Sequence, residues 1–203
     1  MVSKMSEIRV DTISEKTSAN GVAIDSVTLK DGGATLTDNI TFSASGKGVH
    51  LGVTSATASN LLDDYEVGTF TPTLNGTASA PSGVTYNTRL GFYEKIGDIV
   101  HVHVHLSAAS MSSVPGGALT VTGLPFTSDT TSSFLQAGSV GLTSNFASTE
   151  APQVSYINPN TTSMNFVCNN SSDGRNNLED AITCANAMSG NELLVASATY
   201  RSA

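Results

Sequence analysis

The 203-residue chain is poor in charged side chains, and this scarcity limits what it can bind. Only 13% of the residues are charged, with nine lysines and arginines against seventeen aspartates and glutamates. The basic residues are scattered, so no basic stripe can neutralise phosphates, and nucleic acid is not an expected partner. Tryptophan is absent, which argues against a deep sugar groove lined by indole rings and favours shallow recognition by loops.

Long apolar runs and cysteines are also scarce. No stretch reaches about eighteen continuous apolar residues, so no membrane span is expected. The start, "MVSKMSEIRV", lacks the apolar segment of a signal peptide, so we expect a protein that is made and assembled in a cytoplasm. In that reducing compartment Cys168 and Cys184 are expected to be thiols, with a disulfide as the alternative.

What the chain has instead is threonine, valine and glycine, a mixture that suits short strands joined by turns and predicts an all-β fold. Residues 69–203 contain about eight apolar segments separated by turn residues, as in a β-sandwich or jelly roll. Residues 178–188 are the exception, because their apolar residues recur at helical spacing and predict one short helix.

The first 51 residues show a weak repeat. Asp11–Ser14, Asp25–Thr28 and Asp38–Thr41 share the order aspartate, small polar residue, β-branched apolar residue, hydroxyl. Large apolar side chains are too sparse here for a core of their own, so the units are expected to stack on other copies of the chain. This predicts an intertwined, trimeric β stem over 1–51; a flexible arm with chance similarity is the alternative.

A junction over 52–68 separates the stem from a C-terminal knob over 69–203. Within the junction, Leu61, Leu62 and Tyr65 have the spacing of a helical turn.

Three of the four histidines lie in "GDIVHVHVHLSA", residues 97–108. Alternation along a strand places His101, His103 and His105 on one face and valines on the other. Burial of the valine face in a core is enough to explain the strand. The histidines are then expected to form the opposite, polar face, toward solvent or a neighbouring chain. They are weak candidates for metal ligands, a pH-sensitive interface is a further alternative, and no cofactor is expected.

The turn at Gly97–Asp98 decides which face the preceding segment presents. A two-residue loop places Leu90 and Phe92 with the histidines, whereas a three-residue loop places them with the valines. Because burial of both apolar side chains is favourable, the three-residue loop is preferred.

Catalytic motifs are missing. No nucleophile elbow or P-loop occurs, and no two acids of the knob share a strand face at i and i+2. The protein is therefore predicted not to be an enzyme, with a carboxylate pair assembled across a trimer as the alternative. Binding is assigned instead to two loops rich in asparagine and serine, 157–163 and 169–177, with ordinary surface turns as the alternative. The candidate receptor-binding residues are Asn158, Asn160, Thr161, Asn169, Asn170, Ser171, Asp173 and Arg175.

Several blocks resemble fibre proteins of tailed bacteriophages, including cyanophages. Residues 6–32 resemble a segment of such fibres, and "LLDDYEVGTFTPTL", "YNTRLGFYEKIGDIVHVHVHL", "VTGLPF" and "LLVASATYRS" resemble their C-terminal domain. The resemblance covers a little under half of the chain. It implies a homotrimeric virion fibre, joined to other virion proteins by its N-terminal segment. Its knob is then expected to recognise a host-surface glycan or protein non-covalently. The alternatives are a purely structural fibre or decoration protein, and a polysaccharide-degrading tailspike.

Overall fold

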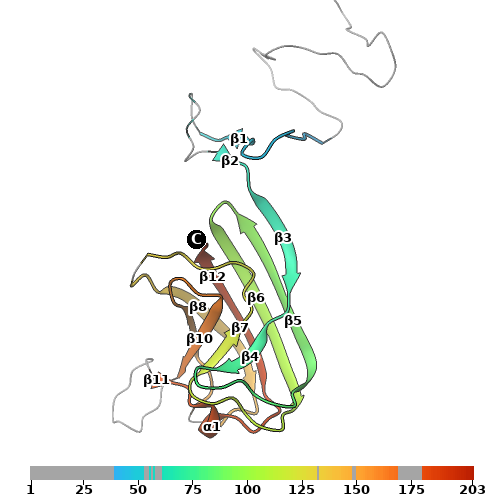
Figure 1. Ribbon diagram of the computed structural model, residues 1–203, viewed down its shortest axis with the longest axis vertical. Coiled ribbons are helices and arrows are strands. Elements are labelled where there is room, and N and C mark those ends of the chain that lie inside the picture. Colours follow the sequence, from blue (N-terminus) through green and yellow to red (C-terminus); the bar gives the residue numbers. More distant parts are fainter. Residues whose placement is uncertain are drawn as a thin grey trace, which may run out of the picture. The chain divides into compact units, whose positions relative to one another are not determined.

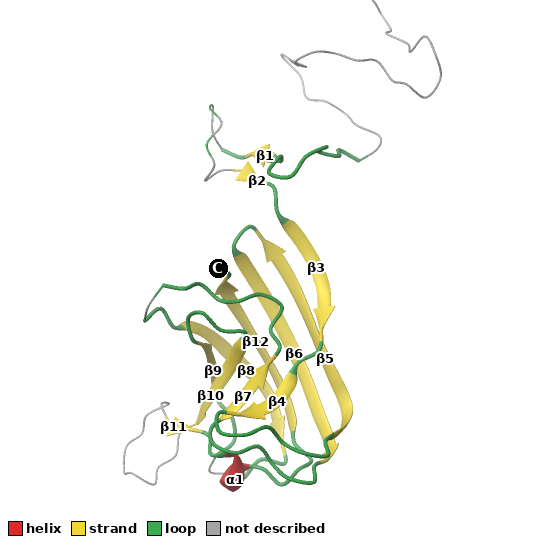
Figure 2. Cartoon of the chain, viewed as in Figure 1, coloured by secondary structure: helices red, strands yellow, loops and turns green. Residues whose placement is uncertain are grey.

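The computed structural model describes residues 39–52, 55, 57, 61–131, 133–147, 150–168 and 180–203. The chain separates into two compact units, residues 1–41 and 42–203, and the account below concerns the second. The all-β prediction is confirmed there, since strands make up nearly all of the regular structure (Figure 2). The repeats that predicted a trimeric stem fall almost entirely outside the described residues, so the stem stays a prediction.

One curled antiparallel sheet contains all of the strands except a short separate pair (Figure 1). Its order is β3-β5-β6-β12-β8-β9-β10-β7-β4, and β11 pairs with β10 at the side. The main strands are β3 (Tyr65–Phe70), β4 (Thr73–Gly76), β5 (Thr85–Ile96), β6 (Ile99–Ser110), β7 (Leu119–Thr122), β8 (Gln136–Ser144), β9 (Val154–Ile157), β10 (Ser163–Cys168) and β12 (Leu193–Arg201). The short elements are β1 (Val49–His50), β2 (Leu61–Leu62), β11 (Asp180–Ala181) and α1 (Cys184–Ala187).

The curl follows from the connection between β3 and β4. These strands are consecutive in the chain but lie at opposite ends of the sheet order, so the sheet must roll back on itself. Pro72 interrupts the strand between them, because proline has no backbone N–H for the ladder. The Arg89 side chain donates to the carbonyl oxygen of Pro72 at 2.8 Å, which holds this corner against β5.

The two halves of the rolled sheet enclose the apolar core. Its fully buried side chains come from both halves: Leu74, Val100, Val102, Val104, Leu106, Leu119, Val121, Ile157, Met164, Phe166, Leu194 and Tyr200. At the end near the β5–β6 turn, the Tyr93 ring packs edge-on against the Phe126 ring, with the ring centroids 5.3 Å apart. The Lys95 ammonium lies 5.5 Å from the Phe126 ring and pairs with Asp64, so a charged head covers that end of the core.

The hairpin of β5 and β6 corrects the preferred register. Ile96 pairs with Ile99, so the loop has two residues, and Leu90 and Phe92 lie on the histidine side opposite His105 and His103. The preference for a three-residue loop was wrong because other groups fill the inner face. Tyr93 packs there, and the Phe70 ring covers Gly91. Gly97 has a φ of +56°, as two-residue hairpin turns with glycine in the first position require.

The two predicted helical segments differ from the structure. Of the described residues 180–188, only Cys184–Ala187 form a helix, because Asp180 and Ala181 pair with Cys168 and Val167 of β10 instead. The predicted helical turn near residue 61 is strand β2, which pairs with β1. In both places strand pairing outweighs a weak helical pattern.

Candidate functional site

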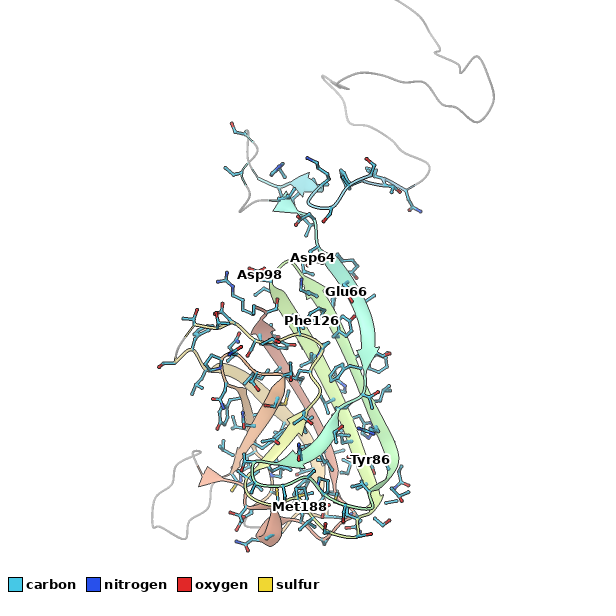
Figure 3. The ribbon with its side chains drawn as sticks, in the orientation of Figure 1. Asp64, Glu66, Tyr86, Asp98, Phe126 and Met188 are labelled. Carbon is cyan, nitrogen blue, oxygen red and sulfur yellow. The ribbon has the colours of Figure 1, made fainter. Side chains whose placement is uncertain are left out.

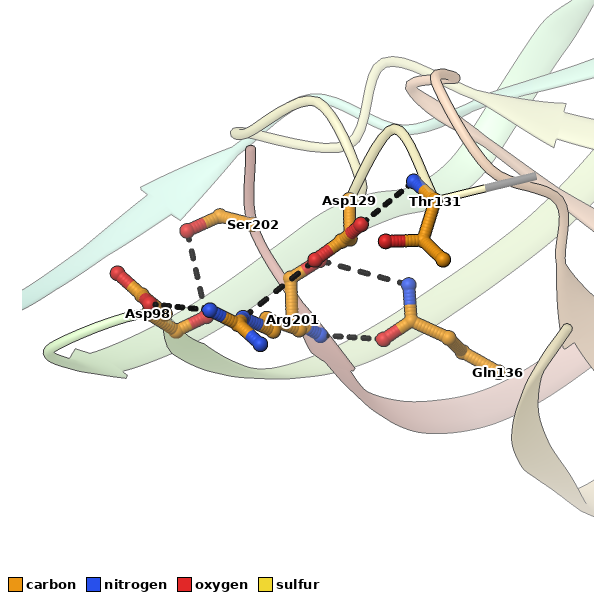
Figure 4. Close-up of polar contacts among 6 residues, drawn as sticks. All are labelled: Asp98, Asp129, Thr131, Gln136, Arg201 and Ser202. Carbon is orange, nitrogen blue, oxygen red and sulfur yellow. Dashed lines mark hydrogen bonds and ion pairs between the residues drawn. The ribbon is translucent and has the colours of Figure 1, made fainter. Parts of the chain in front are cut away.

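A polar cluster that joins three segments lies where β12 ends, beside the β5–β6 turn (Figure 4). The Arg201 guanidinium lies between two carboxylates, at 3.2 Å from Asp98 and 3.4 Å from Asp129. The backbone N–H of Arg201 donates to the side-chain oxygen of Gln136. The backbone N–H of Ser202 donates to the carbonyl oxygen of Asp98 at 2.7 Å. We refer to these residues as the Arg201 cluster; it joins the hairpin turn, the 123–131 loop and the last strand. In Figure 3, Asp98 lies at this end of the sheet and Met188 at the other.

One acid of the cluster, Asp129, is held as a carboxylate. Hydrogen bonds from Thr131, one of them from its backbone N–H at 2.6 Å, lower the pKa of Asp129, and the charge of Arg201 lowers it further. Asp98 contacts the same guanidinium and is more exposed. Carboxylate oxygens accept hydrogen bonds and a guanidinium donates them, so the cluster can bind sugar hydroxyls.

Three of the predicted receptor-binding residues lie next to this cluster. The backbone N–H of Asn160 donates to the carbonyl oxygen of Asp129 at 3.0 Å. The Ser128 hydroxyl donates to the carbonyl oxygen of Asn158 at 2.6 Å. The Thr161 side chain is hydrogen-bonded within its own loop, because its hydroxyl lies 2.6 Å from the Ser163 hydroxyl. The side-chain amides of Asn158 and Asn160 are exposed and make no hydrogen bond within the described part of the chain, so they are available to a ligand.

The other predicted loop residues, Asn169, Asn170, Ser171, Asp173 and Arg175, lie outside the described residues. The roles of all eight candidates stay predictions. Sequence reasoning missed Asp98, Asp129 and Arg201, which are separated by up to 103 residues and meet only because β6 and β12 are neighbours. No local pattern signals such a cluster.

The three histidines lie on the outer surface of the long strands. His101 and His103 are exposed, His105 is half-buried, and the Nδ1 of His101 is 3.0 Å from the Thr199 hydroxyl. Two shallow hollows flank His101. One, of about 270 Å³, is lined mainly by Val67, Phe92, Tyr93, Glu94 and His103; the other, of about 190 Å³, is lined mainly by backbone and hydroxyl groups of β8 and β12.

Within the described residues, no three histidine, cysteine, aspartate or glutamate side chains are arranged to hold a metal ion. Among those same residues, no helix is long and apolar enough to cross a membrane. Cys168 and Cys184 are buried and form no disulfide. Burial raises the pKa of the Cys184 thiol to about 11, so it is protonated and unreactive at neutral pH.

Two further carboxylates are buried for structural reasons. Glu150 accepts a hydrogen bond from the backbone N–H of Thr183 at 3.1 Å, just before α1. Glu192 is fully buried and accepts from the backbone N–H groups of Ser189 and Gly190 through one oxygen. Both therefore hold loop backbone at the α1 end.

Comparison with known proteins points to bacteriophage tail proteins. The chain is 34% identical over 84 residues, 41% of its length, to a Klebsiella phage K64-1 protein named as a capsule KN4-specific depolymerase. The match spans only 11% of that depolymerase. The fold is similar to that of the Dettilon tailspike protein, with a TM-score of 0.51 and 17% identity over 68% of this chain and 24% of that one. No protein-family model matches the chain.

The match to the depolymerase corrects one prediction. The absence of local catalytic motifs led to the expectation that the protein is not an enzyme, and similarity to a chain named as a depolymerase contradicts it. Motif reasoning failed because carboxylates used in glycoside cleavage need no fixed spacing in sequence.

Proposed function

We propose that the protein is part of a bacteriophage tailspike-type assembly that degrades a host capsular polysaccharide. The 34% identity over 84 residues to the capsule-specific depolymerase carries this proposal. The tailspike likeness supports the fold. This function replaces recognition without cleavage, which the sequence had favoured.

Within that function, the Arg201 cluster and the adjoining amides of Asn158 and Asn160 contact the polysaccharide. Carboxylates accept hydrogen bonds from sugar hydroxyls, and amides both donate and accept. The Arg201 guanidinium is paired with Asp98 and Asp129, so the surface offers polar groups with little unpaired charge, which suits a ligand whose hydrogen-bonding groups are mostly neutral. Contact with the glycan at this end does not require that cleavage occur there, since the match spans a tenth of the depolymerase.

The assembly is a homotrimer of the virion tail, completed in the host cytoplasm, and residues 1–51 attach it to other virion proteins. The repeats of the N-terminal segment support this, because units without a core of their own need partners to stack on. Three copies per spike raise the avidity for a polymer whose repeating units bind weakly one at a time.

The test is incubation of the purified chain with capsular polysaccharides, the KN4 type first, followed by measurement of binding and of released reducing ends. The double variant Asn158→Ala and Asn160→Gly should weaken binding, because both amides are lost while glycine keeps the positive φ of 54° at position 160. Asn87→Ala, an exposed asparagine on β5, is the control and should bind as the unaltered protein does. Binding without release would contradict degradation by this chain, and failure to bind any capsule would overturn the proposal.

A further inference from the structure

The outward surface of the long strands has the composition of a surface that another protein covers. We call it the histidine face. It consists of Val67 and Thr69 from β3, Leu90, Phe92 and Glu94 from β5, His101, His103 and His105 from β6, Val195, Ser197 and Thr199 from β12, and Ser139 and Leu142 from β8.

Large apolar side chains are unusually exposed on this face. Val67 is 60% exposed and Phe92 51%, and Leu90 lies beside Phe92 on β5. Leu142, 55% exposed, lies on β8, with His105 and Val195 between it and Leu90. Each square ångström of apolar surface left in water costs about 25 cal/mol, so covering these side chains is favourable. Single exposed apolar residues are ordinary, but adjacent ones on neighbouring strands form a patch of the kind that marks protein interfaces.

Charge is nearly absent from the same face. Glu94 is the one charged residue among those that define it, although the opposite side of β5 carries Arg89 and Lys95. Arg201 follows on the histidine side at the end of β12, at the edge of the face, where it pairs with Asp98 and Asp129. Depletion of charge at the centre is what distinguishes protein interfaces from the rest of a surface. A membrane-binding face would instead be rimmed by lysine and arginine.

The face is also large enough. Five strands at about 4.8 Å spacing, over the nine residues of β12, give a flat area of roughly 570 Å² before side-chain relief is counted. A stable protein interface buries about 800 Å² on each partner, so the face can supply most of one.

We propose that the histidine face packs against other copies of the same chain. The imidazoles favour this occupant, because a neutral imidazole has one donor and one acceptor and can therefore pair with the same group of another copy. Serine and threonine hydroxyls from β8 and β12 are self-complementary in the same way. An almost uncharged sheet face that carries these groups therefore matches itself in hydrogen bonding.

This inference rests on the self-association proposed above and names the surface that carries it. Because residues 1–51 are proposed to hold copies together as well, the oligomeric mass alone does not test the face. The accessibility of the imidazoles does.

The experiment is carbethoxylation of the full chain with diethyl pyrocarbonate, with the rate at each histidine followed by mass spectrometry. N-acetylhistidine added to the same samples serves as the reference, because His50 belongs to the segment that is proposed to hold copies together. If copies cover the face and exclude water, His103 should react about ten-fold more slowly than N-acetylhistidine. Phe92→Glu places a charge in the face and should bring the His103 rate close to that of N-acetylhistidine. Phe134→Glu is the matched control, because Phe134 is also 51% exposed but lies in a loop, and it should leave His103 protected.

Light scattering on the same samples separates the outcomes. An oligomer with protected His103 supports the inference. An oligomer in which His103 reacts as fast as N-acetylhistidine contradicts packing through the histidine face but keeps the self-association. A monomer overturns both, even if His103 is protected, because the cover would then come from within the chain. None of these outcomes depends on capsule degradation, which is measured separately.

Discussion

The two faces of the β5–β6 hairpin differ in burial and in composition. On the inner face Val100, Val102, Val104 and Leu106 are completely buried, and each fills space between the two halves of the sheet. On the outer face the same strand presents three histidines beside exposed apolar residues of β5. The inner residues are determined by packing alone. The outer residues do not pack against the core of their own chain, so their composition indicates which kind of partner contacts this face.

The largest expected difference between the faces is for two leucines. Leu106→Ala should lower the free energy of unfolding by about 2–5 kcal/mol, because it leaves a cavity in a closed core. Leu142→Ala on the histidine face should cost less than about 1 kcal/mol within a single chain, since that side chain is mostly exposed there. Urea unfolding over a range of protein concentrations measures both and separates any loss from contact between copies. Equal losses at every concentration would mean that the outer face is packed within the chain as tightly as the core.

Two glycines give the next comparison. A methyl group on Gly91 would lie 2.5 Å from the Phe70 ring, so Gly91→Ala should cost about 1–3 kcal/mol through displacement of that ring. At Gly141, in the irregular part of β8, the nearest atom would be 3.8 Å away, so Gly141→Ala should be neutral. Thermal unfolding of both variants measures the two losses of stability. A neutral Gly91→Ala would show that Phe70 can move without cost.

Two glutamates extend the comparison to charge. Glu192→Ala should cost about 1–3 kcal/mol, because it removes the acceptor for the backbone N–H groups of Ser189 and Gly190. Glu192→Gln keeps an oxygen for those donors and should lose less. Glu94→Ala, on the histidine face, should lie within about 0.5 kcal/mol of the unaltered protein. Chemical unfolding at pH 7 measures all three, and a harmless Glu192→Ala would contradict a structural role for that carboxylate.

The smallest expected effect is the pH dependence from the Arg201 cluster. The pKa of Asp129 is lowered from 3.8 in the folded state, so the ionised group stabilises the fold above that pH, and this contribution is lost as the pH falls through the lowered value. Asp129→Asn should therefore be less stable than the unaltered protein at pH 7, and the gap should narrow in strong acid. Thermal midpoints across pH 2–7 would show it, with Asp63→Asn as an exposed control. A gap that does not change with pH would assign the loss to the amide and not to the charge.

Local sequence signals carried much of the fold. Alternation predicted β6 and its hairpin with β5, and the apolar segments separated by turn residues indicated that residues 69–203 consist mainly of further strands. The helix over 178–188 was overestimated, because pairing of Asp180 and Ala181 with β10 is a contact between distant segments. The candidate loop residues Asn158 and Asn160 were found from composition, whereas Asp98, Asp129 and Arg201 were not, because their proximity depends on sheet order.

The sequence by itself determined that the protein is built of strands and that one side of "VHVHVHL" is core, because side-chain alternation is a local property of extended backbone. Only the tertiary structure decided which residues share the histidine face. A one-residue difference in the hairpin loop moves Leu90 and Phe92 from one side of the sheet to the other, and the loop that forms is the one that the rest of the core leaves room for. Tyr93 and the Phe70 ring fill the inner side, and Phe92 is left outside beside His103.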